Sequence, residues 1–267
     1  MHPIEHLRYV ARARGADPAS LVRETAHAMS SMRFDPSGLV VACRRVVERH
    51  PECGPLWWLC AHLLTAQEPF QLAWELADEI DDDSTPDALA AAIPDDAVVL
   101  TVGWTDMCTH ALTRRGDVTV LVVESRHHGS SLMQRLERHD VACELVQPEA
   151  IGRAVPVADV VIVEAHAAST ERVVAPIGSG AVAAVAATCD VPVWLVAGVG
   201  RRLPRDLVVA IDERVAKVDV AWELDTDVFS TRCITHVVGV RGLAVSGPEA
   251  LAPECPMVPE LLRVSPI

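Results

Sequence analysis

The chain has 267 residues, half of them apolar, and carries a formal charge of −14 at pH 7. This length and apolar content fit one large α/β domain, or a small helical domain joined to a medium one, and exclude an intrinsically disordered chain. The acidic balance argues against nonspecific binding to nucleic acid or to an anionic membrane, so neither is expected as a partner.

The eight cysteines lie far apart, without a Cys-x-x-Cys pair, as is typical of reduced thiols in the cytoplasm. His50, Cys53, Cys60 and His62 form one loose group, but their spacing matches no zinc pattern, and neither metal nor cofactor is expected. Glu5 and several arginines stand where a signal peptide would be apolar. No apolar run approaches the roughly 20 residues that span a bilayer. We therefore expect a cytoplasmic protein without a membrane span.

Residues 2–93 have the apolar spacing and the start signals of helices. Pro55–Ala66 is apolar on nearly all sides, so it is expected inside a helical bundle or against the next domain. Pro94-Asp95-Asp96 marks a boundary, which gives an N-terminal helical domain over 1–94 and a second domain over 95–267. The predicted helices begin near Ile4 and continue as Leu21–Met32, Gly38–His50, Pro55–Ala66, Phe70–Ile80 and Thr85–Ile93.

From Ala97 onward, short β-branched runs alternate with segments of helical length. Apolar strands without an in-out alternation indicate a parallel sheet that helices cover on both faces. The fold class is therefore α/β, an N-terminal helical bundle followed by a doubly wound, mainly parallel Rossmann-like sheet. The predicted strands are Val98–Val102, Val118–Val123, Cys143–Val146, Val160–Val163 and Val193–Val196, and the helices between them are Thr105–Arg115, Gly129–Arg138, Pro148–Ala154 and Gly180–Thr188.

In such sheets a ligand binds beyond the carboxyl ends of the strands. We therefore expect one pocket, surrounded by the segments Gly103–Asp106, Glu124–Gly129, Glu164–Thr170 and Ala197–Arg201. The C-terminal part has a less regular pattern. It predicts strand material at Asp206–Ile211 and Val215–Glu223, a helix at Asp227–Val238, a last strand at Gly242–Ser246 and a short helix at Glu260–Arg263.

Four segments resemble one protein family in order and spacing over about residues 97–242. The family joins the α, β and δ subunits of eukaryotic translation initiation factor 2B with isomerases of methylthioribose 1-phosphate and ribose 1,5-bisphosphate. The similar segments are Val99–Thr105 (family "ILT.G.S"), Val122–Arg126 ("ESRP"), Val161–Ala167 with Ile177–Ser179 ("VIVGADA" and "NKIGT"), and Asp227–Phe229 with Ile234–Gly239 ("FDVTPP..IT.IVTE.G").

The departures from the family pattern concern the isomerase chemistry. Gly103 stands where the isomerases have a cysteine, His166 where they have the aspartate of "GAD", and Ala175-Pro176 where they have Asn-Lys. Proton transfer between adjacent sugar carbons needs an acid and a base held over the substrate. Because both family groups are replaced, we expect a protein that is not an enzyme of this type.

The resemblance leaves the binding residues in place. Gly178, Ser179 and Gly180 would offer amide groups and a hydroxyl to a phosphate at a helix N-terminus. Arg126 would add a bidentate charged contact, and Gly103 with Trp104 would form the turn beside the ligand. Two alternatives stay open: that the glycines serve only strand–helix packing, and that Arg126 is solvated or ion-paired.

His166 is the candidate catalytic residue, because an imidazole titrates near neutrality and could replace the missing acid or base. Its candidate partners are Asp106, Glu124, His127 and His128. The alternative is a histidine that hydrogen-bonds the ligand or only fills space.

Three functions follow from these observations. The first is a protein similar to initiation factor 2B that binds a phosphorylated sugar or nucleotide without the isomerase chemistry. The second is a divergent aldose-ketose sugar-phosphate isomerase that uses His166. The third is a non-catalytic scaffold or regulatory subunit, with Trp57, Trp58 and Trp104 as candidate anchors. The resemblance also implies a homodimer that pairs through the C-terminal domain.

Overall fold

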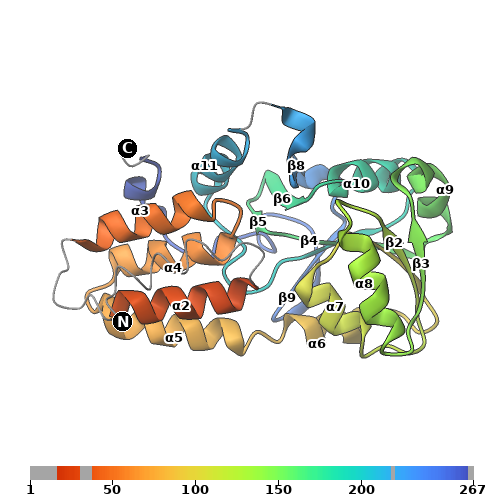
Figure 1. The fold of residues 1–267 in the computed structure, drawn as a ribbon, viewed down its shortest axis with the longest axis horizontal. Coiled ribbons are helices and arrows are strands. Elements are labelled where there is room, and N and C mark those ends of the chain that lie inside the picture. The colour runs from red at the N-terminus through yellow and green to blue at the C-terminus, as the bar shows by residue number, and fades with distance from the viewer. Residues whose placement is uncertain (1–16, 31–37, 218–219, 264–267) are drawn as a thin grey trace.

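The structure is a computed structural model, and it describes residues 17–30, 38–217 and 220–263 of the chain. A bundle of helices forms one end of the molecule, and a sheet covered by further helices forms the other (Figure 1). The helices of the first part are α2 (Pro18–Ser30), α3 (Leu39–Arg49), α4 (Gly54–Thr65), α5 (Pro69–Asp81) and α6 (Thr85–Ala92). Each overlaps a predicted helix. The helix expected near Ile4 and the predicted end at Met32 lie outside the described residues.

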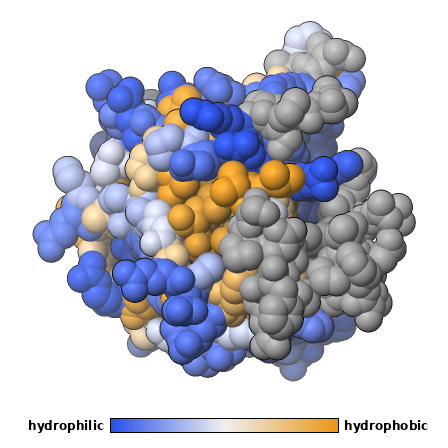
Figure 2. Space-filling model, turned by 90° about the vertical axis from the view of Figure 1, so that its left-hand side faces the viewer, coloured by the Kyte–Doolittle hydropathy of each residue, from blue (hydrophilic) through white to orange (hydrophobic). Residues whose placement is uncertain are grey.

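Helix α4 is the central helix of the bundle, as its apolar sequence predicts, and it contacts α2, α3 and α5. Trp57 and Trp58 are buried to 0% and 2% exposure, and Trp57 Nε1 donates a hydrogen bond of 2.9 Å to the carbonyl of Pro51. These two tryptophans therefore belong to the core and cannot be the surface anchors of a scaffold. Figure 2 shows hydrophobic residues at the far end of the bundle, with hydrophilic ones beside them.

The second part is built on a seven-stranded sheet with the order β10-β9-β7-β4-β1-β2-β3. All neighbouring pairs are parallel except β9 and β10, which are antiparallel. The predicted doubly wound α/β fold is confirmed. The strands are β1 (Val98–Val102), β2 (Thr119–Val123), β3 (Ala142–Val146), β4 (Val160–Glu164), β7 (Val193–Val196), β9 (His236–Gly239) and β10 (Gly242–Val245).

Helices cover both faces of this sheet. Side chains that alternate along each strand point to opposite faces and so enter different cores. Leu100 of β1 packs in a core with α10 (Ser179–Thr188). Val99 packs on the other face, in a core shared with α6, α7 (Asp106–Leu112) and α8 (His128–Glu137). A third core fills the helical bundle and extends to Ala167, Val174 and α11 (Arg205–Val215), so the bundle and the α/β part are packed together.

Three predictions for the C-terminal part, at Asp206–Ile211, Val215–Glu223 and Asp227–Val238, are wrong in the residues that the structure describes. Asp206–Ile211 lies in helix α11 and not in a strand, because Leu207, Val208 and Ile211 turn to one buried face and Pro204 starts the helix. Asp227–Val238 is not a helix. Its β-branched residues form β8 (Thr226–Ser230) and β9, separated by the 3₁₀ turn Thr231–Cys233.

The remaining C-terminal segments are short. The described part of Val215–Glu223 contains the end of α11 and the turn Ala221–Glu223, and no strand. The last strand is present as β10, and a 3₁₀ turn at Pro259–Leu261 overlaps the predicted short helix at Glu260–Arg263.

A small second sheet with the order β5-β6-β8 was not expected. Strands β5 (Ala167–Ala168) and β6 (Arg172–Pro176) form a hairpin between β4 and α10, where no strand was predicted, and β8 pairs antiparallel with β6. This sheet brings Asp227 of β8 next to the start of α10.

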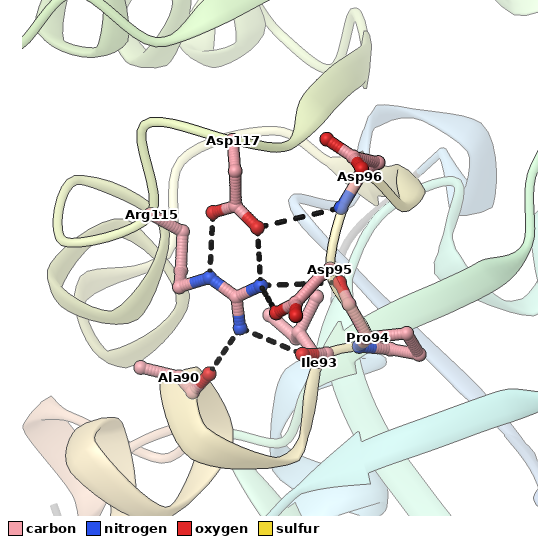
Figure 3. A network of polar contacts seen from close by, with 7 residues as sticks. All are labelled: Ala90, Ile93, Pro94, Asp95, Asp96, Arg115 and Asp117. Carbon is pink, nitrogen blue, oxygen red and sulfur yellow. Dashed lines mark hydrogen bonds and ion pairs between the residues drawn. The ribbon is translucent and has the colours of Figure 1, made fainter.

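Arg115 joins the end of α6 and the segment between α6 and β1 to the turn before β2 (Figure 3). Its Nη1 donates to the carbonyls of Ala90 at 2.7 Å and Ile93 at 2.6 Å, and Nη2 donates to the carbonyl of Pro94 at 3.1 Å. The other contacts are to Asp95 and to Asp117, whose pKa Arg115 lowers. The predicted boundary between residues 94 and 95 therefore lies in a turn that one guanidinium holds in place.

Candidate functional site

A cavity of about 670 Å³ lies beyond the carboxyl ends of β1, β2 and β4. The four segments predicted to surround one pocket all contribute to its lining, and the N-terminus of α4 forms the opposite wall. Among the predicted site residues, Gly103, Trp104, Arg126 and His166 line this cavity. A smaller cavity of about 400 Å³ lies at β9 and β10, away from these strand ends.

The turn after β1 forms one side of the cavity. Gly103 has φ +62°, a conformation that favours glycine, and a Cβ there would lie 3.2 Å from Ser125 Cβ. Trp104 is held by a hydrogen bond of 3.0 Å from its Nε1 to Asp106 Oδ1. Both Trp104 and Asp106 therefore face the cavity in a fixed arrangement.

The turn after β2 contains two residues in the left-handed region, Arg126 with φ 50° and His127 with φ 66°. Arg126 Nη2 donates to the carbonyls of Trp222 at 2.7 Å and Leu224 at 3.3 Å, and its Nε lies 3.7 Å from Asp225 Oδ1. The guanidinium of Arg126 thus already has protein partners, and it connects the turn after β2 to residues 222–225 before β8.

Glu124, a candidate partner of His166, caps helix α8. Its carboxylate accepts hydrogen bonds from the amides of Ser125, Gly129 and Ser130, and from Ser130 Oγ at 2.6 Å. Partial burial raises the pKa of Glu124, but these hydrogen bonds outweigh it and the pKa is lowered. Glu124 is therefore a charged helix cap and does not line the cavity.

Glu164, His166 and Arg201 line the part of the cavity at the end of β4, which we call its floor. Glu164 and Arg201 form an ion pair there. Arg201 Nη1 lies 3.0 Å from Glu164 Oε1, and both side chains are only 4% exposed. Arg201 also donates to the carbonyl of Ala165, and Glu164 Oε2 accepts a hydrogen bond of 3.0 Å from the amide of Cys108. Burial raises the pKa of Glu164, and the charge of Arg201 opposes this.

Sequence reasoning did not select this pair as site residues. A signal was present, because Glu164 is the one charged residue in the apolar strand Val160–Glu164. The partner could not be inferred, since Arg201 lies 37 positions later and only the pairing of β4 with β7 brings them together.

His166 lies at the same floor, partly buried, with its backbone fixed on both sides. Its amide donates to the carbonyl of Val174 at 2.8 Å, and its carbonyl accepts from the amide of Gly54 at 3.1 Å. Burial, and then the charge of Arg201, lower the pKa of His166 to about 4. The imidazole is therefore neutral at neutral pH.

Gly178, Ser179 and Gly180 do not line the cavity. The amides of Gly178 and Gly180 donate to Asp227 Oδ2 at 2.8 and 3.0 Å, so a carboxylate of the chain itself occupies the N-terminus of α10. Ser179 is buried, and its Oγ has no hydrogen-bond partner among the described residues.

The cavity is less acidic than the chain as a whole. Its lining contains five basic residues and five acidic ones, against 23 and 37 in the full sequence. Arg49 and Lys217 are exposed at its rim. Arg214 lies over the ring of Trp57 at 4.9 Å and donates to the carbonyl of Leu261 at 2.8 Å. The basic lining residues are Arg49, Arg126, Arg201, Arg214 and Lys217.

Several solved structures with the same fold are translation initiation factors. The translation initiation factor eIF-2B of Pyrococcus horikoshii is 17% identical with a TM-score of 0.75, over 93% of this chain and 98% of that one. The delta subunit of eIF2B from Chaetomium thermophilum is 17% identical with a TM-score of 0.70, over 89% and 96%. A chain of the tetrameric eIF2B-beta2-delta2 complex of that organism is 14% identical with a TM-score of 0.74, over 93% and 91%.

At these identities the similar structures establish the fold alone. No curated protein matches the sequence. The model of the Initiation factor 2 subunit family matches residues 71–217, which is more than half of the chain and includes β1, β2, β4, β7 and most of the cavity lining. The chain is a member of the Initiation factor 2 subunit family.

Proposed function

We propose that this chain binds a small phosphorylated ligand, a sugar phosphate or a nucleotide, in the cavity of about 670 Å³ and does not convert it by isomerase chemistry. The observation that carries the proposal is the charge balance of the cavity, whose lining holds five basic and five acidic residues, whereas the full chain holds 23 and 37. The volume lies within the range of about 300–1,000 Å³ that is usual for small-molecule sites.

The phosphate belongs at the rim in this proposal. Arg49 and Lys217 are exposed there, and the residues before and within the first turn of α4, Glu52, Cys53 and Pro55, line the same side. The N-terminal end of a helix carries a partial positive charge that favours an anion. A phosphate at Gly178–Gly180, the position predicted from sequence, would first have to displace Asp227.

Isomerisation is disfavoured by the protonation states around the floor. His166 is neutral and has a pKa of about 4, so it is a weak base at neutral pH and holds no extra proton to donate. Glu164 is ion-paired. An isomerase that uses His166 stays the alternative, because Asp106 lines the same cavity and is a second group that can transfer a proton.

A thermal-shift screen tests binding, because a ligand that binds only the native state raises its stability. We expect stabilisation by at least one of ribose phosphates, methylthioribose 1-phosphate and nucleoside monophosphates. The effect should weaken in Arg49→Gln with Lys217→Gln and persist in the control Arg153→Gln, whose exposed side chain is far from the cavity. If no phosphorylated compound stabilises the protein, the proposal is wrong and the scaffold function is favoured.

Turnover is tested on any compound that binds, by following its proton spectrum by NMR in the presence of the protein. We expect no conversion. If conversion occurs and is lost in His166→Ala, the alternative enzyme replaces the binding function.

We also propose that the chain forms a homodimer through its C-terminal part. The related beta and delta subunits are described as a tetrameric complex, and here β10 is an edge strand with Leu243 and Val245 exposed to 38% and 75%. Light scattering after size-exclusion chromatography should give twice the mass of 28.8 kDa at micromolar concentration. A monomer at that concentration would contradict the proposal.

A further inference from the structure

We propose that the floor of the cavity binds a carboxylate group of the ligand through the Nε and Nη2 edge of Arg201. This inference rests on the proposed function and refines it: the ligand is a phosphorylated acid, with its phosphate at the rim and its carboxylate at the floor.

The first observation is that Arg201 is buried and incompletely hydrogen-bonded. It is 3% exposed, yet it lines the cavity. Its Nη1 is used by Glu164 Oε1 and the carbonyl of Ala165, but its buried Nε has no hydrogen-bond partner among the described residues. A buried charged donor without a partner is costly, and at Arg201, which lines the cavity, a ligand could supply that partner.

The second observation concerns which edge of the guanidinium is free. Because Glu164 and Ala165 both engage Nη1, the adjacent donors Nε and Nη2 remain, and no hydrogen bond of Nη2 is formed within the described part of the chain. These two N–H groups are parallel and match the two oxygens of a carboxylate in a bidentate contact. A lysine could not provide this geometry.

The third observation favours a carboxylate over a phosphate. Glu164 lies 3.0 Å from Arg201 and already neutralises its charge, so a dianionic phosphate would meet a carboxylate with little net positive charge to offset it. His166, beside them, is a neutral imidazole that can donate one hydrogen bond at most. A monoanion with two acceptor oxygens fits this small number of donors, whereas a phosphate has three terminal oxygens to satisfy.

Glu164 has the role of a positioning residue. It ends β4 opposite Val196 of β7, and the amide of Cys108 at the start of α7 holds its second oxygen at 3.0 Å. Since both carboxylate oxygens are engaged, Arg201 is held in one orientation with its free edge toward the cavity. The binding geometry is therefore preorganised, which lowers the entropic cost of binding.

The test compares compounds that differ only in the carboxylate. Calorimetry is performed with 6-phosphogluconate against sorbitol 6-phosphate, and with erythronate 4-phosphate against erythritol 4-phosphate. Each pair is open-chain and shares its phosphate. We expect the acid of at least one pair to bind about tenfold or more tightly, the effect of a charge-assisted hydrogen-bonded contact.

The variant Glu164→Gln with Arg201→Gln should remove this preference. The double change avoids leaving either charge buried alone. The matched control is Arg202→Gln with Glu254→Gln, an ion pair that does not line this cavity, and it should keep the preference. Circular dichroism confirms that both variants are folded, and a Glu164→Gln/Arg201→Gln protein that does not fold is replaced by Arg201→Lys, which keeps the charge but loses the fork.

The outcomes separate the two proposals. If the acids and the polyol phosphates bind equally, or if the preference survives in both floor variants, the carboxylate site is wrong while the phosphate-binding function stands. If none of these compounds and no other phosphorylated compound binds, both proposals are wrong.

Discussion

The carboxylate of Asp227 lies 2.8 Å from the amide nitrogen of Gly178, and the same oxygen also accepts a hydrogen bond from Gly180. Strand β8 thus supplies a carboxylate to the N-terminus of α10. The amides of Gly178 and Gly180, which the sequence analysis assigned to a phosphate, instead donate to Asp227, 49 positions after Gly178.

Replacing Asp227 by alanine should destabilise the protein by about 1–2 kcal/mol, because the first turn of α10 loses its cap. Urea unfolding measures the change. The control Asp225→Ala removes a carboxylate that is 83% exposed, and it should change the stability by less than about 0.5 kcal/mol. If both variants were equally stable, the contact of Asp227 with Gly178 would not stabilise the helix.

Replacing Gly54 by alanine should cost more than about 2 kcal/mol. The new Cβ would lie 2.3 Å from the carbonyl oxygen of His166, so α4 would have to move away from the loop that it contacts. The control is Gly116→Ala, whose Cβ would meet no atom within 4 Å, and which should be neutral or slightly stabilising. A shift of the unfolding midpoint in the first variant alone supports the close contact.

Replacing Arg115 by lysine should lower stability by about 1–2 kcal/mol, because an ammonium cannot contact the carbonyls of Ala90 and Ile93 and the carboxylate of Asp117 at once. The neighbouring change Arg114→Lys affects a surface ion pair with Asp87, 57% and 63% exposed, and should have no measurable effect. Equal melting temperatures for the two variants would argue against a stabilising role of the Arg115 contacts.

Replacing Arg201 alone by glutamine should cost about 3–5 kcal/mol, because Glu164 would be left buried without its partner. The double variant with Glu164→Gln should recover a large part of this loss. A double-mutant cycle by urea unfolding measures the coupling. Additive effects would show that the two residues do not stabilise one another.

His166 should make stability depend on pH in a defined window. Its pKa is about 4 in the folded protein and 6.5 without the environment of the fold, so the unfolded chain binds more protons between these values. The free energy of unfolding therefore decreases as the pH falls from about 6.5 to about 4. The loss is on the order of 2 kcal/mol at pH 4.5. Above about pH 6.5 this group has little effect on stability.

His166→Gln should remove this part of the pH dependence, measured as urea midpoints at pH 4.5, 5.5 and 7.5. The exposed His110→Gln serves as the comparison. A wild-type slope that is unchanged in His166→Gln would mean that other groups cause it.

The sequence was sufficient for elements whose pattern is local. The apolar run of β4 and the all-round apolar α4 are visible in a few residues each, and both were predicted. Asp206–Ile211 was misread because Val208 and Val209 favour strands in isolation, whereas the packing of Leu207 and Ile211 on the bundle selects a helix.

The position of the cavity was predicted, whereas the contacts within it were not. The carboxyl ends of parallel strands meet at one edge, so Gly103, Trp104, Arg126 and His166 could be expected around one pocket. The partners of Asp227 and Arg201 could not be foreseen, because they depend on which strands pair, and the pairing of β8 with β6 is a tertiary property.

One wall of the cavity is the start of α4 with residues of α2 and α3, and the other walls are loops of the sheet and the end of α11. The space therefore exists only while the helical bundle and the sheet keep their present relative orientation. A ligand that contacts both Arg49 and Arg201 would resist rotation between them. Occupancy of the cavity would then affect every surface whose shape depends on that orientation.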